Sequence, residues 1–110
     1  MKMRLGFVSN SSSSSYLVAS ENTYDFERLV YSYPAMDGPN KIVAVGKDAV
    51  TTFLEEWDLD NVENVIGLVK SFDEKYTVYL VNISRNDPGL FDAMRVLHQN
   101  NILAYWYLGE

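Results

Sequence analysis

The chain has 110 residues, 47% of them hydrophobic and 14% aromatic, which is enough apolar material for one folded domain over residues 1–110. It contains no cysteine, which excludes a disulfide framework, thiolate zinc ligands and thiol nucleophiles. The net charge of -6 disfavours nucleic acid as a partner, because binding to the phosphate backbone requires a basic surface.

Two short strands are predicted at the start of the chain, at residues 3–8 and 16–19, joined by a polar loop rich in serine. The loop consists of Ser9, Asn10, Ser11, Ser12, Ser13, Ser14 and Ser15. Its simplest interpretation is a flexible tether, although its hydroxyl groups can also bind an anion or be modified. Because both flanks are apolar, we expect them to pair as neighbouring strands and to order much of the loop.

The middle of the chain alternates helical and strand patterns. Apolar residues recur at helical spacing in three places, which predicts three helices. These residues are Phe26, Leu29, Val30 and Tyr33; Val50, Phe53, Leu54 and Trp57; and Val62, Val65, Ile66 and Val69. The first helix follows capping side chains at residues 20–23 and stops at Pro34, and the third is capped by Asp60. Residues 41–45 form an apolar run that predicts a buried strand.

The C-terminal third predicts a strand, a helix and a second strand. Residues 76–83 and 102–108 are runs of β-branched, aromatic and aliphatic residues. Between them, Asp87 and Pro88 mark a helix start, and Asn100 and Asn101 mark its end. A crossover of this length normally joins parallel neighbours. We therefore expect an α/β sandwich with a mixed sheet of about five strands, in which the two C-terminal strands are parallel neighbours.

A weak signal for ligand binding comes from two turns that lead from a strand into a helix. Gly46 and Lys47 lie in the first turn and Arg85 in the second. Such turns present backbone N–H groups to a phosphate, but the spacing of a P-loop or a dinucleotide fingerprint is absent, and an ordinary strand-to-helix turn is the favoured interpretation. We predict no catalytic residue, metal ligand or cofactor, and expect His98 to interact with the end of its helix.

Two further groups of residues are candidates for protein interaction. Between Lys47 and Lys70 every charged side chain is acidic, which predicts either a solvated face or a ridge that docks on a basic partner surface. The ridge comprises Glu55, Glu56, Asp58, Asp60 and Glu63. Tyr105 and Tyr107 lie on one face of the last predicted strand, where core packing and an exposed interface are equally compatible with the pattern.

The opening string Gly6-Phe-Val-Ser-Asn-Ser-Ser-Ser-Ser-Ser-Tyr16 resembles the start of many small proteins of tailed bacteriophages and prophages. Those proteins typically begin Met-Lys-x-Arg-x-Gly-Phe-Val-Ser-Asn-Ser-Ser-Ser-Ser-Ser-Phe, so Tyr16 replaces the usual phenylalanine. The resemblance covers about the first seventeen residues and implies a phage-like origin. It implies no activity, and no catalytic residue follows from it.

We therefore expect a small acidic accessory protein that binds a host or phage macromolecule without chemistry, in the cytoplasm, which is the host cytoplasm if the protein is phage-encoded. No stretch approaches membrane-spanning length. A first alternative is a binder of a phosphate-bearing small ligand, or an enzyme, and a deep cavity lined by Lys47, Arg85 and the serine loop would favour it. A second alternative is a minor structural component of the virion. The oligomeric state and the partner's identity do not follow from the sequence.

Overall fold

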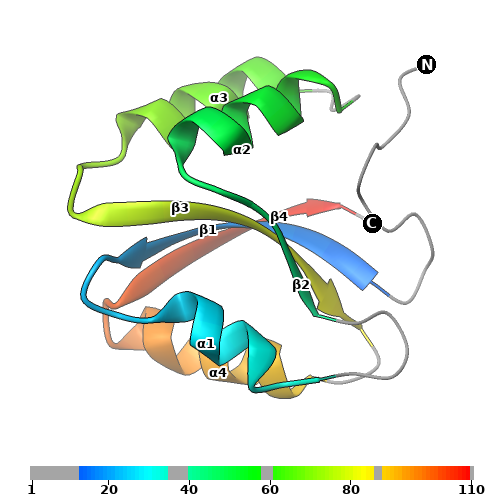
Figure 1. The fold of residues 1–110 in the computed structure, drawn as a ribbon, viewed down its shortest axis with the longest axis vertical. Coiled ribbons are helices and arrows are strands. Elements are labelled where there is room, and N and C mark those ends of the chain that lie inside the picture. The colour runs from blue at the N-terminus through cyan, green and yellow to red at the C-terminus, as the bar shows by residue number, and fades with distance from the viewer. Residues whose placement is uncertain (1–12, 35–39, 58–60, 86–87, 110) are drawn as a thin grey trace.

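The computed structural model describes residues 13–34, 40–57, 61–85 and 88–109. Within these ranges, four strands and four helices form an α/β structure in which one sheet lies between two pairs of helices (Figure 1). The elements are β1 (Ser13–Glu21), α1 (Phe26–Tyr31), β2 (Lys41–Val45), α2 (Lys47–Glu55), α3 (Val62–Ser71), β3 (Tyr76–Ser84), α4 (Gly89–Gln99) and β4 (Leu103–Gly109).

The sheet is open, its strand order is β2-β3-β1-β4, and each described pairing is antiparallel. The prediction of parallel neighbours at the C-terminus is therefore wrong. β3 and β4 do run in the same direction, as the crossover through α4 requires, but β1 lies between them and pairs with both. A crossover helix sets the relative direction of two strands and leaves open whether a third strand from elsewhere in the chain separates them.

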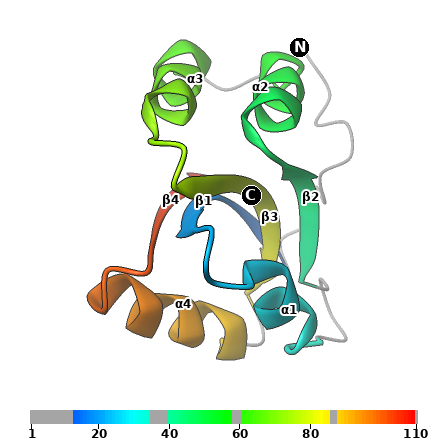
Figure 2. The same cartoon turned by 60° about the vertical axis from the view of Figure 1, so that its left-hand side comes forward.

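The same arrangement occurs at the other end of the sheet. β1, α1 and β2 form a second crossover unit, and β3 lies between its two strands. Two split βαβ units are thus interleaved. The helices α2 and α3 lie in the connection between β2 and β3, and they cover the face of the sheet opposite to α1 and α4 (Figure 2).

Because both faces of the sheet are covered, the two central strands carry apolar residues on both sides. Leu17 of β1 and Leu80 of β3 pack with α2 and α3 in one core, which also buries Trp57. Val18 and Val81, their neighbours in sequence, pack with α1 and α4 in the second core. This alternation decides which side chains of β1 and β3 can reach each helical layer.

The start of β1 differs from the prediction. The strand begins at Ser13, so the last three serines of the expected loop belong to a strand and are buried. The earlier loop residues and the predicted strand at residues 3–8 lie outside the described residues. The described chain has four strands, and the prediction of about five is not supported.

The helix boundaries are close to those predicted. The cap of α1 is Asp25, whose carboxylate accepts a hydrogen bond from the backbone N–H of Arg28 at 3.1 Å. The expected capping residues lie before it: β1 extends to Glu21 and so includes two of them, and the turn that follows contains the other two. The exit from α4 is left-handed at Asn101, with φ of 62°, as predicted. None of the described helices has the length and apolar character needed to cross a membrane.

Candidate functional site: a cavity beside the serine strand

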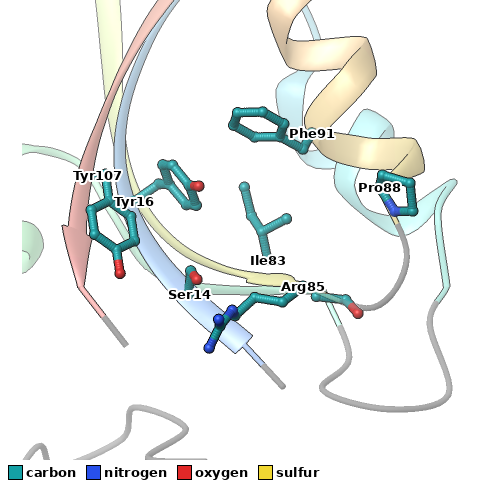
Figure 3. A pocket seen from close by; sticks show the side chains of 8 residues that line it. Ser14, Tyr16, Ile83, Arg85, Pro88, Phe91 and Tyr107 are labelled. Carbon is teal, nitrogen blue, oxygen red and sulfur yellow. The ribbon is translucent and has the colours of Figure 1, made fainter. Parts of the chain in front are cut away.

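A cavity of about 360 Å³ lies where the start of β1 meets the end of β3 and the start of α4 (Figure 3). The register places Ser14 of β1 opposite Ile83 of β3, and Arg85 follows directly after β3. The cavity is lined by Ser14, Tyr16, Ile83, Ser84, Arg85, Pro88, Phe91 and Tyr107. Residues from three parts of the chain that are distant in sequence, namely β1, the junction of β3 with α4, and β4, therefore meet here.

The polar part of the cavity is formed by Ser14, Tyr16 and Arg85. Ser14 is only 5% exposed, and its hydroxyl group makes no hydrogen bond to any described residue. Figure 3 shows the guanidinium group of Arg85 extending past Ser14, with the Tyr16 ring on the other side of the serine. Among the described residues that line the cavity, Arg85 is the one charged side chain. The site combines a cation with neutral hydroxyl groups.

The apolar wall is an aromatic cluster, which we define as Tyr16, Phe91, Tyr105 and Tyr107. The ring centroid of Tyr16 lies 5.7 Å from that of Phe91, 5.5 Å from that of Tyr107 and 6.1 Å from that of Tyr105. These distances are typical of favourable tilted and edge-to-face contacts. The cluster fixes the rings of β1, β4 and α4 relative to one another and so defines the shape of the cavity.

Burial raises the pKa of Tyr16 above its ordinary value of 10.0, and the neighbouring Tyr107 and Tyr105 raise this pKa further, while Arg85 lowers it. The Tyr16 hydroxyl group is therefore neutral at physiological pH and can both donate and accept a hydrogen bond. Arg85 and Tyr16 both line the cavity. An anion entering the cavity would meet both groups.

The other predicted ligand turn lies elsewhere. Gly46 adopts φ of 92°, a conformation that favours glycine, and its N–H donates to the carbonyl of Val78 at 2.8 Å. The Lys47 amine donates to the carbonyl of Phe72, just after α3. Both residues form hydrogen bonds that connect the start of α2 to β3 or to the end of α3. Lys47 does not line the cavity that contains Arg85 and Ser14.

The acidic ridge lies on the opposite helical layer. Glu55 and Glu56 at the end of α2 and Glu63 at the start of α3 are exposed, while Asp58 and Asp60 lie outside the described residues. α2 and α3 pack together on the same face of the sheet, so the three described carboxylates belong to one end of that layer (Figure 2). In the described part of the chain, no three His, Cys, Asp or Glu side chains gather as metal ligands.

The two tyrosines of β4 have different environments. Tyr105 is half-buried in the aromatic cluster, whereas Tyr107 is 57% exposed and borders the cavity. His98 lies beside Tyr105, with ring centroids 5.4 Å apart, and its Nδ1 is 3.1 Å from the carbonyl oxygen of Leu103. Its contacts link α4 to β4 and lie away from the cavity.

A polar pair lies on the other side of the serine strand. Ser15 Oγ donates to Asn82 Oδ1 at 2.9 Å, and both residues are buried on the side of the sheet that faces α2 and α3. Within the described residues, Ser13 Oγ and Asn82 Nδ2 are buried without a hydrogen-bond partner. The serines of β1 thus serve two faces: Ser15 binds Asn82 inside the core, and Ser14 lines the cavity.

Sequence reasoning selected Arg85 and the serine tract but missed Tyr16, Ile83 and Phe91 as lining residues. The available signal was the alternation of side chains in a strand, which places Ser14 and Tyr16 on one face once the strand is extended back into the serine tract. A scan against protein-family models, a search of curated proteins and a search of solved structures each return no match to this chain.

Proposed function

We propose that this protein is a binding module that recognises an anionic group, a phosphate or a carboxylate, attached to a small apolar group. In this proposal the anion lies against Arg85 and Ser14, and the apolar group lies against Phe91 and Tyr16. The proposal retains the expected role of a small acidic, phage-like accessory protein and identifies the chemistry that its partner would carry.

The observation that carries the proposal is the hydroxyl group of Ser14. Ser14 is only 5% exposed, yet it lines the cavity, so its hydroxyl group can donate a hydrogen bond to a ligand there. It lies beside a guanidinium group, whose planar set of N–H donors matches the oxygens of a carboxylate or phosphate. A bound anion would accept hydrogen bonds from both side chains.

The dimensions of the cavity restrict the ligand. Its volume of about 360 Å³ is at the lower end of the range of roughly 300 to 1,000 Å³ found for small-molecule sites. One anionic group and one small ring fit this volume better than a whole nucleotide. The described lining residues include no carboxylate and no histidine, so their chemistry suits binding better than acid–base catalysis.

A macromolecule that presents the anionic group is our preferred source, because the cavity opens beside the exposed Tyr107 on the edge strand of the sheet. A longer partner can therefore extend from the cavity across β4. A free small ligand and a role in the virion are the alternatives, and both would use the same chemistry at Arg85.

The proposal is tested by titrating isotope-labelled protein with phenyl phosphate, benzoate and inorganic phosphate while following amide NMR shifts. We expect shifts concentrated at Ser14, Tyr16 and Arg85, with phenyl phosphate or benzoate binding more tightly than inorganic phosphate. Titration with a short peptide containing phosphotyrosine, or ending in a phenylalanine carboxylate, distinguishes a group carried on a chain from a free ligand, because only a carried group gains affinity from the flanking residues.

Arg85→Gln should weaken binding by about 10-fold to 100-fold, since hydrogen bonds to charged groups contribute roughly 1.5 to 3 kcal/mol. Arg95→Gln is the matched control: Arg95 is an exposed arginine on α4 that pairs with Asp92 at 3.2 Å and does not line the cavity. Shifts spread evenly over the surface, or an equal loss of affinity in both variants, would contradict the proposal.

A further inference from the structure

The second inference concerns the outer edge of β4, which ends the sheet and pairs with no described strand on its outer side. The carbonyl of Ile102 accepts a hydrogen bond from the N–H of Glu21 on β1 at 3.1 Å. Because backbone groups alternate in direction along a strand, those of Ala104 and Trp106 also point toward β1. The N–H and C=O groups of Tyr105 and Tyr107 therefore point away from the sheet.

This edge lacks two of the devices that normally prevent pairing with another chain, a charged side chain and a proline. β4 runs from Leu103 to Gly109 without a charged residue or a proline. The opposite edge of the sheet, β2, is shorter, begins with the exposed Lys41 and has an irregular register between Ile42 and Ala44. The pairing of β4 with β1 also has an irregular register, between Tyr107 and Gly109, so the two edges differ in length and in charge.

The sequence of β4 is nearly symmetric about its centre. The segment Ala104-Tyr-Trp-Tyr-Leu108 reads aliphatic, Tyr, Trp, Tyr, aliphatic in either direction. An antiparallel copy of the same strand would therefore place tyrosine opposite tyrosine and tryptophan opposite tryptophan, with no like charges facing one another. This symmetry is what distinguishes a second copy of the chain from an unrelated peptide as the occupant of the edge.

We propose that two copies of this chain associate through β4, with the two-fold axis at Trp106, into one continuous sheet. Tyr105 of each copy lies opposite Tyr107 of the other, and each such pair exchanges both of its outward backbone hydrogen bonds. Trp106 faces Trp106 as a pair without hydrogen bonds, the arrangement in which side chains are closest. The exposed ring of Tyr107 is buried in the process.

The surroundings of β4 fit this arrangement. A shallow cavity of about 240 Å³ lies between β4 and α3, and Val65, Leu68, Trp106 and Leu108 are among its lining residues. It offers apolar space beside the proposed axis for a side chain of the second copy. Trp106 itself is held against Phe72, with ring centroids 5.3 Å apart, so its position on the strand is fixed before association.

Charge sets the expected salt dependence. Each copy carries a net charge of -6, whereas β4 has no charged residue. The two copies therefore repel each other through charges that lie away from the proposed interface. Screening acts over roughly 10 Å at 0.1 M salt. The dimer should therefore become stronger as salt concentration rises, opposite to an interface built on ion pairs.

The first test is the mass in solution, measured by light scattering coupled to size-exclusion chromatography. We expect twice the chain mass of 12.6 kDa at micromolar concentration, with a larger dimer fraction in higher salt. A mass of one chain across the accessible concentration range would overturn the proposal.

A disulfide trap locates the axis, because the chain has no cysteine of its own. Trp106→Cys places one thiol in each copy at the axis, where facing Cα atoms of a pair without hydrogen bonds are about 4.5 Å apart, within the disulfide range. Tyr107→Cys is the control, since its counterpart lies opposite residue 105 of the other copy. We expect the first variant to crosslink at least about ten times faster in mild oxidant. Equal rates would contradict the proposed register.

Loss of Trp106 packing can itself disturb the fold, so a surface variant provides an independent test. Tyr107→Lys should yield a monomer with an unchanged far-UV circular dichroism spectrum, because lysine on an edge strand blocks pairing. Val96→Lys changes a residue of similar exposure, 55%, on α4 and should remain dimeric. A dimer in both variants, or a monomer in both, would exclude β4 as the interface. Trp106→Cys and Val96→Lys leave every described residue that lines the ligand cavity unchanged, and the mass of the unmodified protein is measured without ligand, so failure of the dimer leaves the proposed ligand site standing.

Discussion

Replacing Ser15 with alanine should lower the stability of the protein far more than the same change at Ser14. The Ser15 hydroxyl group donates to Asn82 Oδ1 at 2.9 Å, and the two residues are 1% and 0% exposed. Ser15→Ala removes the donor and leaves the carbonyl oxygen of the Asn82 side chain buried without a partner. The adjacent Nδ2 already has no partner among the described residues, so the whole carboxamide would become unsatisfied.

The magnitude follows from this geometry. A buried hydrogen bond contributes about 1 kcal/mol net, and leaving its partner unsatisfied costs roughly 1 to 3 kcal/mol in all, so we expect a loss of about 2 kcal/mol. For a domain of this size that corresponds to a fall in the melting temperature of roughly 8 °C. Ser14→Ala breaks no hydrogen bond among the described residues and should change stability by less than about 0.5 kcal/mol.

The assay is urea unfolding followed by circular dichroism, with both variants compared with the unmodified protein at equal concentration. Ser15→Gly should add up to about 1 kcal/mol to the loss, because glycine inside a strand has more conformational freedom in the unfolded chain. Equal midpoints for Ser15→Ala and Ser14→Ala would refute the reasoning. They would show that the serine strand acts as a tether and that its hydrogen bond to Asn82 contributes no stability.

Three other predictions follow from the charged and titratable side chains. Changing Glu55, Glu56 and Glu63 together to Gln should leave the melting temperature nearly unchanged but slow association with a lysine-rich peptide at low salt, as measured by stopped-flow fluorescence. An association rate that stays the same at all salt concentrations would exclude a role of these carboxylates in attracting a basic partner. Lys47→Met should lower the free energy of unfolding, measured in urea, by about 1 kcal/mol, because the Lys47 amine donates a hydrogen bond to the carbonyl of Phe72 at the end of α3. Binding of phenyl phosphate should be unchanged, and weaker binding would place Lys47 in the ligand site. Burial raises the pKa of Tyr79 above its ordinary value of 10.0, so the stability that this residue contributes is complete below pH 10 and declines as pH rises through the raised pKa. Tyr79→Phe should therefore reduce the loss of unfolding free energy above pH 10. An identical loss in the variant and the unmodified protein would contradict this role of Tyr79.

The strands and helices were largely predictable from local pattern, whereas the sheet order was not. β2 starts and ends at the predicted residues, and β3 starts where the pattern begins at Tyr76. Which strands are neighbours in the sheet depends on pairing between segments that are distant in sequence. β1 fits a central position, where helices cover both faces of the sheet, because it carries apolar residues on both sides, such as Leu17 and Val18. Nothing in the local spacing of the C-terminal unit contains that information.

The candidate site was predictable only in part. Serine favours loops by its own chemistry, so the tract was interpreted as a loop. In the folded chain Ser13, Ser14 and Ser15 are held in a strand by pairing with Ser84, Ile83 and Asn82, an interaction across most of the chain length. Once that register is known, the approach of Ser14 to Arg85 follows from the alternation of the strand. Without it, the sequence does not show which residues lie beside Arg85.

The central place of β1 also determines when the protein can fold. Its partners are residues 76–84 and 103–109, so the first strand of the described chain is flanked by the last two. Closing loops of this length requires that the intervening chain be ordered first or at the same time, which makes folding slow compared with a helical protein of the same size. During synthesis on the ribosome, β1 must wait unpaired, with apolar side chains exposed on both faces, until β3 has left the exit tunnel, and its other edge stays open until β4 follows. The nascent chain is accordingly most prone to aggregation, and most in need of chaperone protection, while β1 has no partner strand.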